Sequence, residues 1–472
     1  MVLARLLGPK DFGLVGMVTA FTGVLTLFRD FGLSAAAIQK ADVTEEQIST
    51  LFWINISVGV VLAILALAGA PAIAFFYREP RLFGVTAALA LGFVFNAAGI
   101  QHSVLLQRQM RFTALAIINT VGLIVGTAIA IGGAKAGYGY WALVAMTVTV
   151  PFVSSVGFWL ATAWIPGMPQ RRAGIRSMVR FGGTVTLNGL ISYVASNSEK
   201  VLLGRFWGVD ALGIYGRAYQ LINIPTDNLN SAAGEVAFSA LSRLQNDPIR
   251  LKTYFLKGYS LILAMTVPIT VGCALFADDI IRVLLGPKWA AAAPIFRWLA
   301  PTILAFAIIN PLFWLLSSLG LVGRSLKMSL VIGPVMILSY VIALPYGPRG
   351  VALAYSSVMT LLVIPVIAWS VKGTVISFRD ILRTLSRPLA SSIVGGLVAV
   401  GVVSVYGHLL SPLPRLFLEN GLLLGTFIGM LLFVMGQKVL YLDLLMGLRR
   451  PSSAKVEKGL ASAPPLHLGD SV

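Results

Sequence analysis

Two segments of this chain repeat each other at a distance of 200 residues. Arg5 to Gly16 reads RLLGPKDFGLVG and Arg205 to Gly216 reads RFWGVDALGIYG, with one arginine and three glycines in the same register. A weaker pair, Gly137 to Val144 (GYGYWALV) and Gly347 to Ala354 (GPRGVALA), lies 210 residues apart. Both copies of the first pair lie among long apolar stretches. Duplicated bundles of membrane spans are the usual construction of secondary transporters, so the repeat predicts transport.

The composition independently predicts a membrane protein. Hydrophobic residues make up 57% of the 472 residues and charged residues only 11%, against about 25% charged residues in an average soluble domain. Lys and Arg outnumber Asp and Glu by 36 to 18, for a net charge of +18. These basic residues are scattered between apolar stretches, which favours a role in membrane topology over nucleic-acid binding. One Cys and three His predict neither a disulfide framework nor a metal site.

The chain contains about thirteen apolar runs that approach or exceed the roughly 20 residues needed to cross a bilayer. The joints between them are short, which excludes an inserted soluble domain. We therefore expect an all-α integral membrane protein with these spans near 12–38, 51–76, 82–106, 112–137, 140–163, 182–205, 211–243, 254–281, 292–319, 324–346, 350–372, 385–407 and 414–441.

The start of the first copy lacks one span. Arg205 follows an apolar run from about 182, whereas only four residues precede Arg5. Restoring that span gives about fourteen helices: two six-helix repeats that form two lobes around a central cavity, and two C-terminal helices. We expect the reading frame to continue upstream of Met1, because of a late start codon or a truncation. The alternative is a chain of thirteen spans whose N-terminus lies outside.

Domain boundaries and orientation follow from the spans and the basic residues. The linker carries Arg171, Arg172, Arg176 and Arg180, and the positive-inside tendency places such a linker in the cytoplasm. The same alternation places the C-terminus in the cytoplasm. The predicted parts are a first repeat without its first span (1–165), the linker (166–180), a second repeat (181–372), two C-terminal spans (373–448) and a disordered cytoplasmic tail (449–472).

Several segments resemble the polysaccharide transporter family. They are LARLLGPKDFGLVG (3–16), FRDFGLSAAAIQ (28–39), FFYREP (75–80), LLQRQMRF (105–112) and LLGRFWGVDALGIYGRAY (202–219). These Wzx-type flippases belong to the superfamily that also holds multidrug cation antiporters and the lipid II flippase. The resemblance implies movement of undecaprenyl-diphosphate-linked oligosaccharides across the bacterial inner membrane by alternating access, for capsule, exopolysaccharide or O-antigen synthesis.

The resemblance also implies partners, and the motifs of the chain limit the driving force. The partners are the lipid-linked oligosaccharide, membrane lipids, and the polymerase and glycosyltransferases of the same pathway, with no nucleic acid. We expect no cofactor, because the chain has no phosphate-binding Gly-Lys-Ser or Gly-Lys-Thr motif. A proton or sodium gradient, or consumption of the product outside, is then the candidate driving force.

Charged residues within the spans are the candidate site residues. A charge within a span costs about 2.5–3.5 kcal/mol on insertion scales, so one that is retained usually faces a wet cavity. An arginine there can bind two diphosphate oxygens at once. The family usually has Asn-x-Asp where this chain has Asn197-Ser198-Glu199. We predict substrate binding by Arg29, Arg217 and Asn197, and ion coupling by Asp30, Glu199 or Glu235.

Other interpretations remain open at this point. The charged residues could form structural ion pairs or extend to the membrane surface. A multidrug or cation antiporter shares the expected fold, but carboxylates would then dominate its cavity. A membrane glycan polymerase would be an enzyme with sizeable outer loops, and the outer loops of this chain are short.

Overall fold

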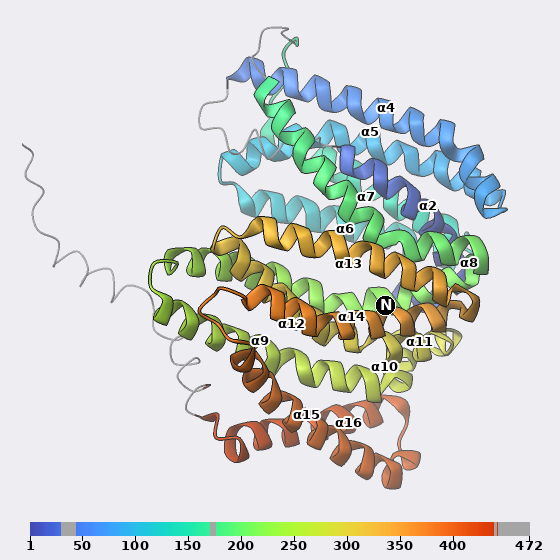
Figure 1. Cartoon of the computed structure of the whole chain (residues 1–472). Helices are drawn as coiled ribbons and strands as arrows, with labels where there is room; N and C mark the ends of the chain where they lie inside the picture. The colour runs from blue at the N-terminus through green and yellow to red at the C-terminus, as the bar shows by residue number, and fades with distance from the viewer. Residues whose placement is uncertain (30–43, 170–175, 439–440, 442–472) are drawn as a thin grey trace, which may run out of the picture.

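The computed structural model describes residues 1–29, 44–169, 176–438 and Tyr441. Within this part of the chain all regular structure is helical. A helix satisfies its own backbone hydrogen bonds, as the interior of a bilayer requires. Figure 1 shows the long helices running alongside one another across the molecule. The prediction of an all-α, multi-pass membrane protein is confirmed.

The first half of the chain forms two packed helix pairs. Helices α4 and α5 lie against each other, and so do α6 and α7; they occupy the upper part of Figure 1. Thr44 begins α4 by accepting a hydrogen bond from the backbone N–H of Gln47, an N-cap that satisfies an otherwise free donor. The elements are α1 (Val2–Leu6), α2 (Pro9–Phe28), α4 (Glu45–Tyr77), α5 (Arg81–Arg108), α6 (Phe112–Lys135) and α7 (Tyr140–Thr162).

The second half begins with a long helix that is broken at one glycine. Helix α8 has non-helical dihedral angles at Gly208 (φ 79°, ψ −169°), a region that favours glycine because it lacks a Cβ. We call residues 176–207 the first arm and 209–243 the second arm; they contain the spans predicted at 182–205 and 211–243. The elements are α8 (Arg176–Arg243), α9 (Pro248–Leu275), α10 (Ala277–Leu284), η1 (Pro287–Trp289), α11 (Ala292–Leu299), α12 (Pro301–Ser318), α13 (Val322–Ala343), η2 (Leu344–Tyr346) and α14 (Gly347–Val371).

The C-terminal helices attach to the second half. Helix α15 packs against α9 and α16, and the pair lies at the bottom of Figure 1. Ser377 and Asp380 form a capping box at the start of α15. The elements are α15 (Phe378–Tyr406), η3 (Gly407–Leu409), α16 (Pro412–Gly429) and the π-helical turn η4 (Met430–Val434).

Ten helical segments of the described residues are long and apolar enough to cross a membrane. One of them, 323–371, contains both α13 and α14, and the two arms of α8 are not among the ten. The expected count of about thirteen or fourteen spans therefore stays a prediction. The domain boundaries stay predictions as well.

The two repeated segments cross each other in backbone contact. A Cβ atom at Gly13 would lie 1.9 Å from the carbonyl oxygen of Val209, and one at Gly213 would lie 2.0 Å from that of Pro9. The two contacts are equivalent, because Gly13 and Gly213, like Pro9 and Val209, lie 200 residues apart in the two repeated segments. Only glycine permits such an approach, as in membrane helix pairs that associate through small residues. The repeated glycines thus bring α2 and the second arm of α8 together.

The segment FFYREP contains the end of α4 and the turn that leads into α5. Arg78 ends α4 in the left-handed conformation (φ 58°). Glu79 then accepts a hydrogen bond from Nε of Arg81 at 2.8 Å. This bond holds the pKa of the Glu79 carboxyl below its usual range. Glu79 and Arg81 therefore form a local ion pair at this turn.

Candidate functional site

A cavity of about 580 Å3 lies between α2, α7 and α8, beside the glycine crossing. We call it the crossing cavity. Phe12 and Val15 contribute part of its apolar wall, and α7 contributes Leu143 and Met146. The cavity also has polar lining residues on α2, α7 and both arms of α8, namely Thr19, Thr147, Lys200, Arg217, Tyr219, Gln220, Asn223 and Asp227.

Arg217, predicted to bind substrate, lines the crossing cavity. Its guanidinium lies over the ring of Phe12, 3.6 Å from the ring centroid, and donates a hydrogen bond to Oε1 of Gln220. A cation over an aromatic face is attracted by the ring without losing its charge. Among the described residues no carboxylate lies within ion-pair distance of Arg217. Its positive charge is therefore available to an anionic ligand.

Asn197 contributes to the crossing cavity through Lys200. Its Oδ1 accepts a hydrogen bond from Nζ of Lys200 at 2.7 Å, and its Nδ2 donates to the carbonyl of Tyr193 at 3.0 Å. Lys200 also lies 5.2 Å from the centroid of the Tyr219 ring. Asn197 thus positions the lysine that lines the cavity. Sequence reasoning gave Lys200 no role, because a lysine near a helix end ordinarily extends to the surface.

Arg29 lines a second cavity, of about 500 Å3, between α5, α6 and α7. It follows Phe28 at the C-terminal end of α2, and residues 30–38 of the predicted span lie outside the described residues. Its Nη1 donates to Oδ1 of Asn96 at 3.2 Å, while its Nε is buried without a partner among the described residues. This cavity is rich in polar groups: Asn96, Ser103, Gln107, Asn119, Ser154 and Ser155.

The two cavities adjoin along α7. Thr147 lines both of them, with Leu143 and Met146 on the crossing-cavity side and Ser154 and Ser155 on the side of Arg29. The two predicted arginines therefore do not meet at one point. They lie in neighbouring hollows that one face of α7 connects.

The predicted coupling acids are only partly described. Glu199 lies in the first arm with 2% of its surface exposed, and neither carboxyl oxygen has a hydrogen-bond partner among the described residues. A buried carboxylate in that state is costly unless it is protonated or binds a cation. Asp30 lies outside the described residues, and so does the side chain of Glu235 in the second arm.

No metal site accompanies these acids in the part of the chain that the structure describes. No group of three or more His, Cys, Asp or Glu side chains is arranged there to hold a metal ion. A single buried acid can exchange a proton or weakly bind one small cation, but it does not make a cage for a divalent metal.

Sequence comparisons connect the chain with polysaccharide biosynthesis. The family model described as "Polysaccharide biosynthesis protein" matches residues 2–294. Teichuronic acid biosynthesis protein TuaB of Bacillus subtilis is 31% identical over 287 residues, which cover 60% of this chain and 59% of TuaB. Lipopolysaccharide biosynthesis protein WzxC of Escherichia coli is 25% identical over 332 residues, covering 69% and 67%. The match to TuaB thus spans less than two thirds of that relative.

A third relative carries the word transport in its name. Succinoglycan biosynthesis transport protein ExoT of Rhizobium meliloti is 23% identical over 310 residues, which cover 66% of this chain and 62% of ExoT. This name agrees with the expectation of a transporter rather than an enzyme, whereas the structural neighbours below concern the fold alone.

Comparison with solved structures supports the fold. The lipid II flippase MurJ in an inward closed conformation superimposes with a TM-score of 0.72 and 14% identity, covering 94% of this chain and 95% of MurJ. An inward-facing multidrug transporter of the MATE family gives a TM-score of 0.64 at 14% identity, covering 78% and 91%. At such identity the likeness concerns the fold alone. The family match covers more than half of the residues, and the chain therefore belongs to the polysaccharide biosynthesis protein family.

Proposed function

We propose that this protein is a flippase that moves undecaprenyl-diphosphate-linked oligosaccharide repeat units across the bacterial inner membrane. The product would serve exopolysaccharide, capsule or O-antigen synthesis, with the pathway's polymerase and glycosyltransferases as partners. The C-terminus faces the cytoplasm in this proposal. The observation that carries it is the crossing cavity, where two cationic side chains face one hollow between the two halves of the chain.

The cations of the crossing cavity suit a diphosphate. Arg217 and Lys200 line the same cavity, and neither has a carboxylate partner among the described residues. Arginine offers a planar fork for two phosphate oxygens and lysine a compact charge. Gln220, Asn223 and Tyr219 add amide and hydroxyl groups to the same lining. These groups would orient the sugars next to the diphosphate.

Alternating access would use the glycine crossing as its pivot. The contacts of Gly13 and Gly213 hold α2 against the second arm of α8 beside the cavity. We infer two repeats of six spans that rock about this crossing and open the cavity first to one side and then to the other. Arg29, in the adjoining cavity along α7, would receive the diphosphate on the way.

Glu199 is the described candidate for coupling. Its buried carboxyl lies one residue from Lys200, which lines the crossing cavity. Gain or loss of a proton or a sodium ion there would alter the charge beside the substrate. The proposal therefore includes an ion gradient as driving force and needs no bound cofactor.

A cation or multidrug antiporter is the second candidate. Asp227 lines the crossing cavity and Glu199 is buried nearby in the chain, and a cationic substrate would need such carboxylates. The two basic residues in the same lining favour the flippase. A flippase would require the positive charges of Arg217 and Lys200, whereas an antiporter would require the carboxylate of Asp227.

The test replaces Arg217 by Ala and by Lys, and Lys200 by Ala. Arg243→Ala is the matched control, because Arg243 ends the same arm, is exposed and lines neither cavity. Three quantities are measured in the same cells: the lipid-linked repeat units that accumulate in the membrane, the exported glycan and the amount of the protein. We expect Arg217→Ala to abolish export with normal protein amounts, and Arg217→Lys to restore it only in part, because lysine lacks the fork.

Two outcomes would contradict the proposal. Normal export by Arg217→Ala and Lys200→Ala would remove both side chains from the transport path. Unchanged export combined with loss of drug tolerance in Asp227→Asn would identify the antiporter instead.

A further inference from the structure

A third cavity, of about 580 Å3, lies between α9, α15 and the residues that follow α16, away from the glycine crossing. We call it the basic cavity. Its lining includes Pro248 at the start of α9 and Arg383 near the start of α15. Figure 1 shows that these two helices begin at the same end of the bundle, which we expect to face the cytoplasm. Its polar lining includes Lys252, Lys257, Arg383, Arg387, Ser260 and Tyr441.

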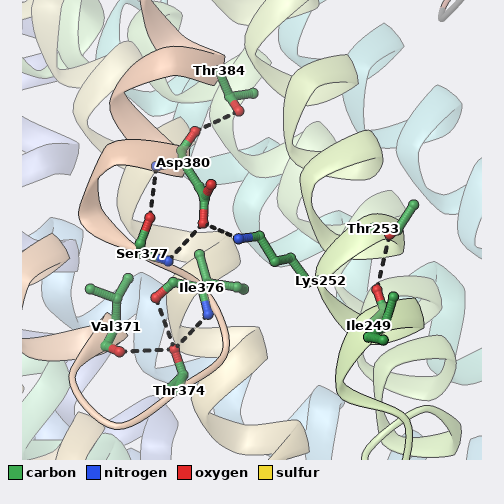
Figure 2. A network of polar contacts seen from close by, with 9 residues as sticks. All are labelled: Ile249, Lys252, Thr253, Val371, Thr374, Ile376, Ser377, Asp380 and Thr384. Carbon is green, nitrogen blue, oxygen red and sulfur yellow. Dashed lines mark hydrogen bonds and ion pairs between the residues drawn. The ribbon is translucent and has the colours of Figure 1, made fainter.

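One of its four cations is neutralised. Nζ of Lys252 lies 2.6 Å from Oδ2 of Asp380. Figure 2 shows that the same carboxylate accepts the backbone N–H of Ser377 at the start of α15. Asp380 is thus already committed to the capping box and to Lys252.

The other three cations have no such partner. Among the described residues no carboxylate lies within ion-pair distance of Lys257, Arg383 or Arg387. Like charges around one hollow repel one another, and the repulsion is relieved when an anion enters. The N-terminus of α9, with Pro248 in the lining, adds a partial positive charge.

Apolar side chains make up much of the remaining lining. Leu256, Val375 and Leu431 are among its lining residues. The wall is closed where the hydroxyl of Tyr441 lies 2.9 Å from Oγ of Ser260. Basic and apolar side chains in one lining match a molecule with an anionic head and hydrocarbon chains better than they match a free ion.

We propose that the basic cavity binds the phosphate head group of an anionic phospholipid of the adjacent leaflet. Arg383, Arg387 and Lys257 contact the phosphate oxygens, and the acyl chains lie along the apolar wall. Juxtamembrane Lys and Arg residues attract anionic lipids in the same way. The lipid bridges α9 of the second half to α15 and to the residues after α16. It therefore stabilises the attachment of the C-terminal helices and is separate from the transported substrate.

The test uses the purified full chain in nanodiscs of phosphatidylcholine, with or without phosphatidylglycerol. Thermal unfolding and native mass spectrometry measure stabilisation and retained phosphatidylglycerol. Arg387→Gln and Arg383→Gln are compared with Arg379→Gln, which removes an exposed arginine of the same helix that does not line the cavity. We expect phosphatidylglycerol to raise the melting temperature of the wild type and of Arg379→Gln. Each cavity variant should weaken its binding about tenfold, the effect of losing one charge-assisted hydrogen bond.

Three results would overturn the proposal. An equal loss in Arg379→Gln would assign the effect to general surface charge. Equal melting temperatures of the wild type with and without phosphatidylglycerol would exclude a lipid site. Full stabilisation by inorganic phosphate in phosphatidylcholine nanodiscs would identify a free-anion site. Glycan export is recorded separately, so failure here leaves the transport proposal intact.

Discussion

Met17 and Arg217 directly follow the two repeated segments at matching positions, yet their surroundings differ. Met17 is fully buried, and the first arm covers it near Gly204, whose Cβ would lie 3.4 Å from the Met17 side chain. Arg217 lines the crossing cavity instead. At this position the first copy is thus covered by a helix, whereas the second copy lines a cavity.

At position 15 of the first copy and 215 of the second, the contrast is reversed. Tyr215 is fully buried and stacks on Tyr219, with ring centroids 6.0 Å apart, and Lys200 of the first arm lies over Tyr219. The corresponding residues of α2 are Val15 and Thr19, which line the crossing cavity. The two copies thus differ position by position in which side chains line the cavity, and in the pair Met17 and Arg217 the charged residue is the one that lines it.

The crossing shared by both copies should be the most sensitive feature. Gly13→Leu or Gly213→Leu places a side chain where the facing backbone oxygen lies about 2 Å from the new Cβ. Because backbone cannot yield as a flexible side chain does, we expect folded protein to be lost from the membrane. The measurement is the amount of monodisperse protein after extraction. Gly216→Ala is the control, since a Cβ there meets nothing within 4 Å; equal yields of all three variants would contradict the crossing.

Placing the arginine of the second copy at the matching position of the first copy should have a smaller but clear effect on stability. Met17→Arg buries an unpaired charge in the closed copy, which destabilises the protein by several kcal/mol. Met17→Leu, a volume-conserving change, should cost less than about 1.5 kcal/mol. Thermal unfolding in one detergent measures both. A Met17→Arg variant as stable as the wild type would show that both copies are equally open.

Accessibility tests the hollow itself with little effect on stability. In a Cys273→Ala background, Thr19→Cys should react readily with a small methanethiosulfonate reagent, because Thr19 is exposed in the crossing cavity. Leu14→Cys, on the same helix but 1% exposed at the native leucine, should react far more slowly. The labelling rates of the two thiols are compared in membranes. Similar slow rates would mean that Thr19 is covered and that this face of α2 does not line the cavity.

Much of the fold could be predicted from residue patterns. Helices are present at the positions of the predicted spans, and the predicted joint between 205 and 211 coincides with the break at Gly208. These features are local, because hydropathy over about 20 residues and a single glycine decide them. The site was harder to predict. Arg217 and Lys200 lie 17 residues apart and share a cavity only because α8 reverses direction at Gly208.

The amino-acid sequence alone predicted a duplicated helical membrane protein. The length of each apolar run and the glycines of the repeated segments are properties of short stretches of chain, and they can be read without knowing the packing. Tertiary packing alone decided that Arg29 and Arg217 line separate, adjoining cavities and that the first arm of α8 meets α2 beside one of them. Those relations depend on which helix faces join across more than one hundred residues. Sequence periodicity in this chain does not distinguish a face covered by another helix from one that lines a cavity.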